Sequence, residues 1–139
     1  MNIDRFKQQH AAILSGIDDL RKLAHAGIAE NAVHLSQGLA DLSNVVTQHL
    51  AVEDRILYPR LENSDNATLS KLSRQFRQEM ASVASPFIAF SRKWRASGDI
   101  RQDPEGFRQE ANTVLKRLYE RMQQEDHHFY PAIEAAEGI

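Results

Sequence analysis

The sequence predicts an all-α protein, an up-and-down bundle of four long helices arranged as two related hairpins. Glycine and proline are scarce, with 6 and 4 among 139 residues, and apolar residues recur at spacings of three and four along most of the chain. The segment "VEDRILYP" at 52–59 returns as "QEDHHFYP" at 124–131, an offset of 72 residues. The repeat pairs a helical hairpin over 1–62 with a second over 67–139, and together they form a single domain, 1–139.

The first hairpin consists of predicted helices over residues 3–26 and 31–57, each with one stripe of inward-facing side chains. Tyr58 and Pro59 end the second helix, because the residue before a proline resists the helical conformation. The stripe of the first helix is Phe6, His10, Ile13, Ile17, Leu20 and Ala24. The stripe of the second is Leu35, Leu39, Leu42, Val46, His49, Glu53 and Ile56.

The second hairpin consists of predicted helices that begin near Ala67 and near Pro104, a residue suited to a first helical turn. Pro86 bends the third helix because it removes one backbone donor, and Tyr130 with Pro131 ends the fourth. The stripe of the third helix is Leu69, Leu72, Phe76, Glu79, Val83, Phe90 and Trp94. The stripe of the fourth is Phe107, Ala111, Val114, Leu118, Arg121, Glu125 and His128.

Composition excludes several classes of protein. Charged residues make up 26% of the chain and the formal net charge is −2, whereas a nucleic-acid binder usually carries a basic face. The chain has no cysteine for a disulfide or a thiolate metal site. It has no apolar run of about 18 residues and no signal peptide, so we expect a cytoplasmic protein. It shows no serine–histidine–acid set and no glycine-rich phosphate loop, so nucleophilic catalysis has no support. Whether the chain is an enzyme stays open at the level of sequence, with a binding protein favoured.

Seven of the inward-facing residues are polar and share one depth in the bundle. Counted from turns near residues 28 and 100, they fall within about 15 Å along the axis, at 1.5 Å per residue. Buried carboxylates without partners cost several kcal/mol each, and a metal ion bound by glutamate and histidine removes that cost. The candidate ligands are His10, His49, Glu53, Glu79, Glu125 and His128, and the seventh residue is Arg121.

The residue types and spacings of this polar layer indicate which metals it suits. His49 and Glu53 lie four apart, and Glu125 and His128 lie three apart, so each pair faces one side of its helix. Imidazole and carboxylate ligands without thiolates suit iron, manganese or zinc. The residue types and spacings by themselves leave iron, manganese and zinc open as the predicted cofactor.

The stretches "FKQQHAAIL" with His10, "QHLAVEDRILYP" with His49 and Glu53, and "QEDHHFYP" with Glu125 carry a family resemblance. Over its whole length the chain resembles the hemerythrin-like (HHE cation-binding) domain family. The resemblance implies a four-helix bundle with a non-haem di-iron centre that Glu53 and Glu125 bridge. It also implies that the protein binds dioxygen, senses oxygen or iron, or handles nitric oxide.

The chain departs from this family at two ligand positions. The family expects a histidine on the third helix, where "RQFRQEM" offers Glu79, and a histidine four residues before Glu125, where Arg121 stands. In one interpretation Glu79 and His128 replace the missing histidines of a di-iron site, and Arg121 balances the added negative charge.

Two other interpretations stay open at the level of sequence. His10, His49, Glu53 and Glu125 alone suffice for one iron or zinc ion. Alternatively Arg121 takes the place of the metal by pairing with the buried glutamates, and the bundle serves as a structural or protein-interaction module. The number of inward-facing histidines and carboxylates favours a metal.

The partners predicted from the sequence are small. The family resemblance implies a diatomic ligand such as dioxygen or nitric oxide, and from the composition we expect neither nucleic acid nor membrane. Apolar residues beyond the main stripes, Leu57 and Phe129 among them, cover the end of the bundle or form a homodimer contact.

Overall fold

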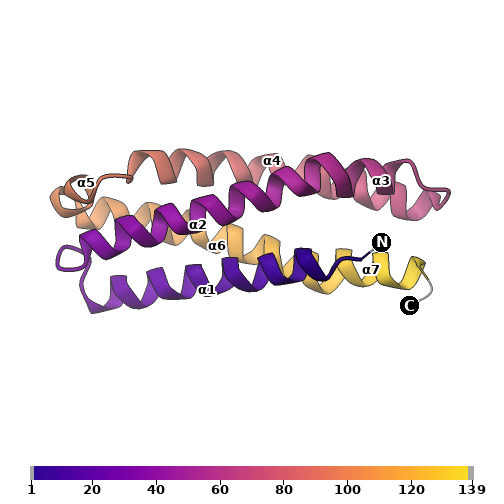
Figure 1. Ribbon diagram of the computed structural model, residues 1–139. Helices are drawn as coiled ribbons and strands as arrows, with labels where there is room; N and C mark the ends of the chain where they lie inside the picture. The colour runs from indigo at the N-terminus through magenta and orange to yellow at the C-terminus, as the bar shows by residue number, and fades with distance from the viewer. Residues whose placement is uncertain (1, 138–139) are drawn as a thin grey trace.

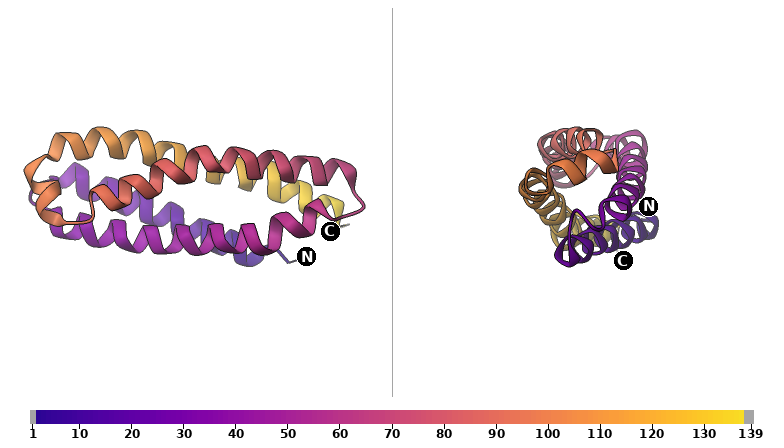
Figure 2. Two further views of the ribbon diagram at one scale, coloured as in Figure 1. Left: turned by 90° about the horizontal axis from the view of Figure 1, so that it is seen from above. Right: turned by 90° about the vertical axis from the view of Figure 1, so that its left-hand side faces the viewer.

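A computed structural model describes residues 2–137, and this part of the chain contains helices and no strand. Its long helices are α1 (Asp4–Ala26), α2 (Ala32–Val52), α4 (Ala67–Lys93) and α6 (Pro104–Gln124). They lie lengthwise beside one another, both from the side and from above (Figures 1 and 2). The predicted all-α class is confirmed, and the starts of the helices near residues 67 and 104 match the prediction.

Both helices that carry the repeated segment continue past the Tyr-Pro pair, contrary to the prediction that they end there. A π-helical turn, η1 (Glu53–Leu57), joins α2 to α3 (Tyr58–Glu62). A second, η2 (Glu125–Phe129), joins α6 to α7 (Tyr130–Ala136). The two prolines fall in the first turn of α3 and α7, where a missing N–H is tolerated.

The π turns change which residues face the interior. In each, the N–H of the tyrosine bonds to the carbonyl five residues back, on Glu53 or Glu125, so the turn holds one residue more than an α-helical turn. Leu57 and Phe129 are therefore fully buried. Ile56, predicted to face inward, is 54% exposed, and the predicted inward residue His128 is exposed as well.

The inward face of α4 also differs from the predicted stripe. Met80 is buried, whereas the adjacent Glu79 has a side chain 53% exposed. The two positions differ by about 100° around the helix axis, and only Met80 continues the buried row that Phe76 begins. Pro86 lies inside α4, which continues beyond it to Lys93.

The core consists of two apolar clusters with a polar layer between them. One cluster lies toward the turns at residues 27–31 and 94–103 and includes Ile13, Leu39 and Leu118. The other, at the opposite end, includes Tyr58 and Tyr130. The short helix α5 (Ser97–Gln102), which the sequence analysis treated as a turn, packs its buried residue Ile100 against α2 and α6.

None of the helices in the described part of the chain is long and apolar enough to cross a membrane. The predicted homodimer contact gains no support from Leu57 and Phe129, because both side chains are fully buried within the chain's own apolar cluster.

Candidate metal centre

Five buried polar side chains form the layer between the two apolar clusters. They are His10, His49, Glu53, Arg121 and Glu125, each 2% exposed or less. His10 projects from the second turn of α1, and His49 and Arg121 from the last turns of α2 and α6. The two glutamates begin the π turns, which are frequent at functional sites.

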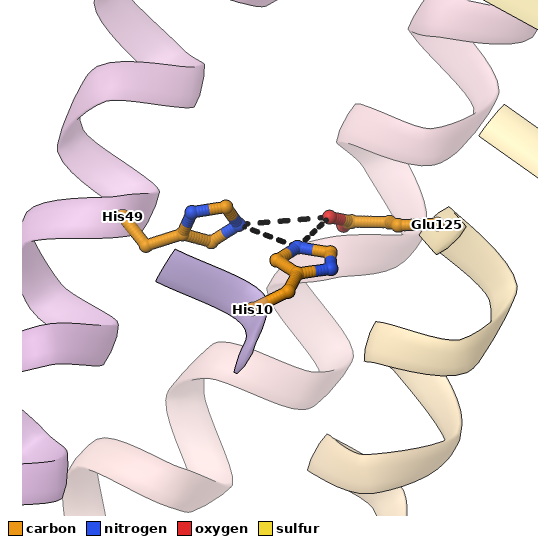
Figure 3. A group of neighbouring side chains, drawn as sticks. All are labelled: His10, His49 and Glu125. Carbon is orange, nitrogen blue, oxygen red and sulfur yellow. Dashed lines mark hydrogen bonds and ion pairs between the residues drawn. The ribbon is translucent and has the colours of Figure 1, made fainter. Parts of the chain in front are cut away.

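Ligand atoms of three of these residues converge on one point (Figure 3). His10 Nε2 lies 2.9 Å from His49 Nε2 and 2.9 Å from Glu125 Oε1, and His49 Nε2 lies 3.6 Å from Glu125 Oε1. Ligand atoms about 2.1 Å from a shared ion, at octahedral or tetrahedral angles, lie about 3.0–3.4 Å apart. The observed spacings lie close to this range, so the three residues could hold one metal ion.

The other nitrogen of each imidazole is held by an oxygen acceptor. His10 Nδ1 donates to Asp126 Oδ1 at 2.9 Å, and His49 Nδ1 donates to Gln9 Oε1 at 2.7 Å. Such contacts orient ligating histidines and fix the proton on Nδ1. The Nε2 atoms then present lone pairs to each other, so a cation or shared protons must lie among the three ligand atoms.

Glu53 lies next to this cluster, in surroundings that disfavour an unpaired negative charge. Its carboxylate is fully buried, and neither oxygen has a hydrogen-bond partner among the residues that the structure describes. Oε1 lies 3.2 Å from His49 Nε2, the nitrogen that faces the other ligand atoms. Burial, reinforced by the negative charge of Glu125, raises the pKa of Glu53 well above its usual range. A bound cation removes this cost.

Glu125 contacts the histidines with one oxygen and Arg121 with the other. Oε1 faces the histidines, and Oε2 accepts a hydrogen bond of 2.7 Å from Arg121 Nε. Burial by itself raises the pKa of Glu125, but contacts with His10 and His49 and the charge of Arg121 together hold that pKa well below its usual range. These contacts therefore favour the ionised form of Glu125.

Arg121 fills the layer on the side of Glu125 away from the histidines. Its Nη2 donates to the carbonyl of Phe76 at 2.8 Å and to Tyr58 Oη at 3.2 Å, and its guanidinium lies over the Phe76 ring at 4.6 Å. Its Nη1 has no hydrogen-bond partner within residues 2–137. Arginine cannot ligate a metal, so this half of the layer carries a fixed positive charge.

Comparison with known families agrees with this geometry. The model of the hemerythrin HHE cation-binding domain matches residues 1–133. The chain belongs to that family. No curated protein and no solved structure gives a significant match. The hemerythrin domain accounts for a buried set of histidines and glutamates whose ligand atoms converge.

Two candidate ligands lie away from this hemerythrin site. Glu79 projects toward solvent, accepts a hydrogen bond of 3.3 Å from Gln75, and comes no nearer to Arg121 Nη1 than 4.0 Å. His128 is exposed because the π turn η2 directs Phe129 inward in its place. The structure thus brings together His10, His49, Glu53 and Glu125 and leaves Glu79 and His128 outside.

Two tyrosines of the repeated Tyr-Pro segment line the site, and the sequence analysis gave them no part in it. Tyr130 Oη donates to Glu125 Oε1 at 3.2 Å and lies 2.9 Å from His10 Nε2. Tyr58 Oη accepts from Arg121. Burial raises the pKa of both phenols, so both stay protonated. The signal in the sequence was the repeat itself, which placed each tyrosine five residues after a buried glutamate.

Proposed function

We propose that this chain is a hemerythrin-type up-and-down four-helix bundle that holds one non-haem iron ion and binds a small diatomic ligand, dioxygen or nitric oxide. The proposed ligands are His10, His49, Glu53 and Glu125. The observation that carries the proposal is the Glu53 carboxylate, which is fully buried and unpartnered beside the converging atoms of the other three.

The proposal of one ion, in place of the two that the family resemblance implies, rests on Arg121. Its Nε donates a hydrogen bond of 2.7 Å to Oε2 of Glu125. Without Arg121, that oxygen would remain available to a second ion. The two residues that would replace the missing histidines, Glu79 and His128, are exposed. Four protein ligands suffice for one ion.

Iron is proposed over manganese and zinc on the strength of the family, since all three accept two imidazoles and two carboxylates. Iron held by these residues would supply a redox-active centre able to bind a diatomic ligand. The chain contributes the enclosure, because the apolar clusters on both sides of the layer exclude bulk water. Tyr130 holds a proton next to His10 Nε2 and Glu125 Oε1.

The test is metal content per chain. Protein from iron-supplemented cells is purified without air, its iron is measured by mass spectrometry, and its optical spectrum is recorded before and after addition of nitric oxide. The expected result is one iron per chain and a new absorption band with nitric oxide. The Glu53→Ala variant should retain no iron.

Glu79→Ala is the matched control, because it also removes a glutamate that was predicted from the sequence to be a ligand. It should keep one iron. Two irons per chain, one of them lost in Glu79→Ala, would overturn the single-ion site. No iron in a fully helical wild-type protein would support the metal-free module in which Arg121 replaces the metal.

A further inference from the structure

A hollow lies on the outside of the bundle, in the groove between α1 and α6 near the turns. Its volume is about 330 Å³. Its lining residues are Leu20, Arg21, Ala24, His25, Phe107, Arg108, Ala111, Asn112, Leu115 and Lys116. We propose that this groove, here called the α1/α6 groove, binds a small amphipathic carboxylate, an organic acid with an apolar body of about ten carbons.

The floor of the groove is apolar and is kept open by small residues. Leu20, Phe107 and Leu115 are buried members of the turn-side apolar cluster. Ala24 and Ala111 lie among them, and their short side chains leave the space between the two helices unfilled. An apolar ligand chain laid along this floor would bury surface of both partners, which is the main source of affinity in small-molecule sites.

The rim of the groove is basic. Arg21, Arg108 and Lys116 are exposed around it together with His25, and no acidic residue is among the groove's lining residues. The formal net charge of the whole chain is −2, so this concentration of positive charge is local and does not follow from composition. It matches the head group of an organic anion.

Two of the rim cations form only long ion pairs with the protein itself, and the third, Arg21, lies over the ring of Tyr119 at 5.6 Å. Arg108 Nε lies 3.8 Å from Glu105 Oε2, and Lys116 Nζ lies 3.9 Å from Glu120 Oε1. Both separations exceed the 2.7–3.2 Å of a direct N–H···O hydrogen bond. Both donors can therefore turn to a carboxylate bound in the groove.

A neighbouring hollow of similar size differs in its charge, because its cation is paired with a carboxylate of the same lining. It lies between α4 and α6, has a volume of about 400 Å³, and its lining includes Lys93 and Glu110. These two form an ion pair of 2.7 Å, and Trp94 also donates to Glu110. The cation in that hollow is paired at hydrogen-bond distance, whereas Arg108 and Lys116 at the α1/α6 groove form only longer ion pairs with acidic residues outside its lining.

The α1/α6 groove is separate from the candidate metal centre. Leu20 stands ten residues beyond His10 on α1, which corresponds to about 15 Å along the helix axis. None of the four proposed metal ligands lines the groove. The inference therefore stands independently of the proposed iron site.

The probe is sodium decanoate, titrated below its critical micelle concentration into the ¹⁵N-labelled, metal-free chain of residues 1–139 and followed by amide chemical shifts. The expected result is saturable one-site binding, with the largest shifts at residues 20–25 and 107–116. Decanol should bind more weakly than decanoate, and decyltrimethylammonium should not bind in the groove. Shifts spread over both hollows, or equal binding of decanol and decanoate, would overturn the basic rim as the determinant.

Two variants test the rim and the floor separately. Arg108→Glu with Lys116→Glu reverses two exposed charges and should weaken decanoate binding by about tenfold or more without changing helicity. Ala111→Leu fills the floor and should weaken decanoate and decanol alike. Arg74→Glu, an exposed charge on α4 outside the groove, is the matched control and should bind as the wild type does. Unchanged decanoate binding in the double variant would refute the proposal.

Discussion

Replacing Arg121 with methionine tests the interpretation of the polar layer most directly. Methionine fills a similar volume without charge or donors. The change removes the hydrogen bonds from Arg121 to Glu125, Phe76 and Tyr58 and leaves Oε2 of a fully buried carboxylate without a partner. In the metal-free protein this should be strongly destabilising.

The magnitude follows from the contacts that are lost. Breaking a buried ion pair by removing one partner costs about 3–5 kcal/mol of unfolding free energy. Arg121 also carries an unpartnered Nη1 in the native protein, and relieving that defect moves the estimate to the lower end, about 3 kcal/mol. With a urea m value of about 2 kcal/mol/M for a domain of this size, the midpoint should fall by about 1.5 M.

The assay is urea unfolding followed by circular dichroism at 222 nm, on protein freed of metal with chelator. Arg77→Met is the matched control, because Arg77 also forms an ion pair, at 3.1 Å with Glu62, but with a side chain 43% exposed. It should cost less than about 1 kcal/mol. A loss below about 1 kcal/mol in Arg121→Met would refute the view that Arg121 neutralises Glu125 in the fold.

The same variant should bind a divalent metal more tightly than the wild type. The positively charged guanidinium of Arg121 is hydrogen-bonded to Glu125 and competes with the metal ion for that carboxylate. Removing it leaves both oxygens of Glu125 to the metal, so isothermal titration should show a lower Kd for Arg121→Met. If Arg121 competes with the metal, Arg121→Met should be less stable than the wild type without metal and should bind metal more tightly. If Arg121 is purely structural, only the loss of stability is expected.

Three further predictions concern individual contacts of the site. Because burial raises the folded-state pKa of Glu53, its contribution to stability is present below the unfolded value of about 4.5 and is lost as pH rises above it; Glu53→Gln, measured metal-free by urea unfolding, should therefore gain stability relative to wild type as pH rises. Asp126→Asn weakens the hold on His10 Nδ1 and should lower metal affinity about 10–100-fold by titration calorimetry, and unchanged affinity would contradict that role. Tyr130→Phe removes a donor to Glu125 and should cost about 1 kcal/mol in the metal-free protein, with no change in helical content.

Much of the site could be predicted from the sequence because it depends on regular helices. His10, His49, Glu53 and Glu125 all precede or begin the π turns, so a constant period of 3.6 residues places them correctly on the inner face. Their burial, with that of Arg121, confirms five of the seven residues of the predicted polar layer, whereas Glu79 and His128 are exposed. The predicted ligand role of these residues stays a prediction.

The parts that could not be predicted follow from departures from that period and from long-range contacts. The π turn η2 displaces His128 outward. On α4 the spacing of the apolar residues is compatible with either Glu79 or Met80 facing inward, and the structure shows that Met80 is the buried one. Gln9 holds His49 across 40 residues of sequence and Asp126 holds His10 across 116. Neither contact has a local signal in the sequence.

The histidine–arginine difference between the two copies of the repeat now has a physical interpretation. His49 and Arg121 stand at equivalent places, each four residues before the glutamate that opens a π turn. His49 turns a lone pair toward the convergent ligand atoms, whereas Arg121 turns a permanent positive charge toward the far oxygen of Glu125. Two buried carboxylates need positive charge from some source. In this chain Arg121 supplies one permanent positive charge. The second negative charge would have to be balanced on the side of the layer where the imidazoles of His10 and His49 lie. An exchangeable cation there would complete the balance, and a second cation would meet Arg121 already in its place.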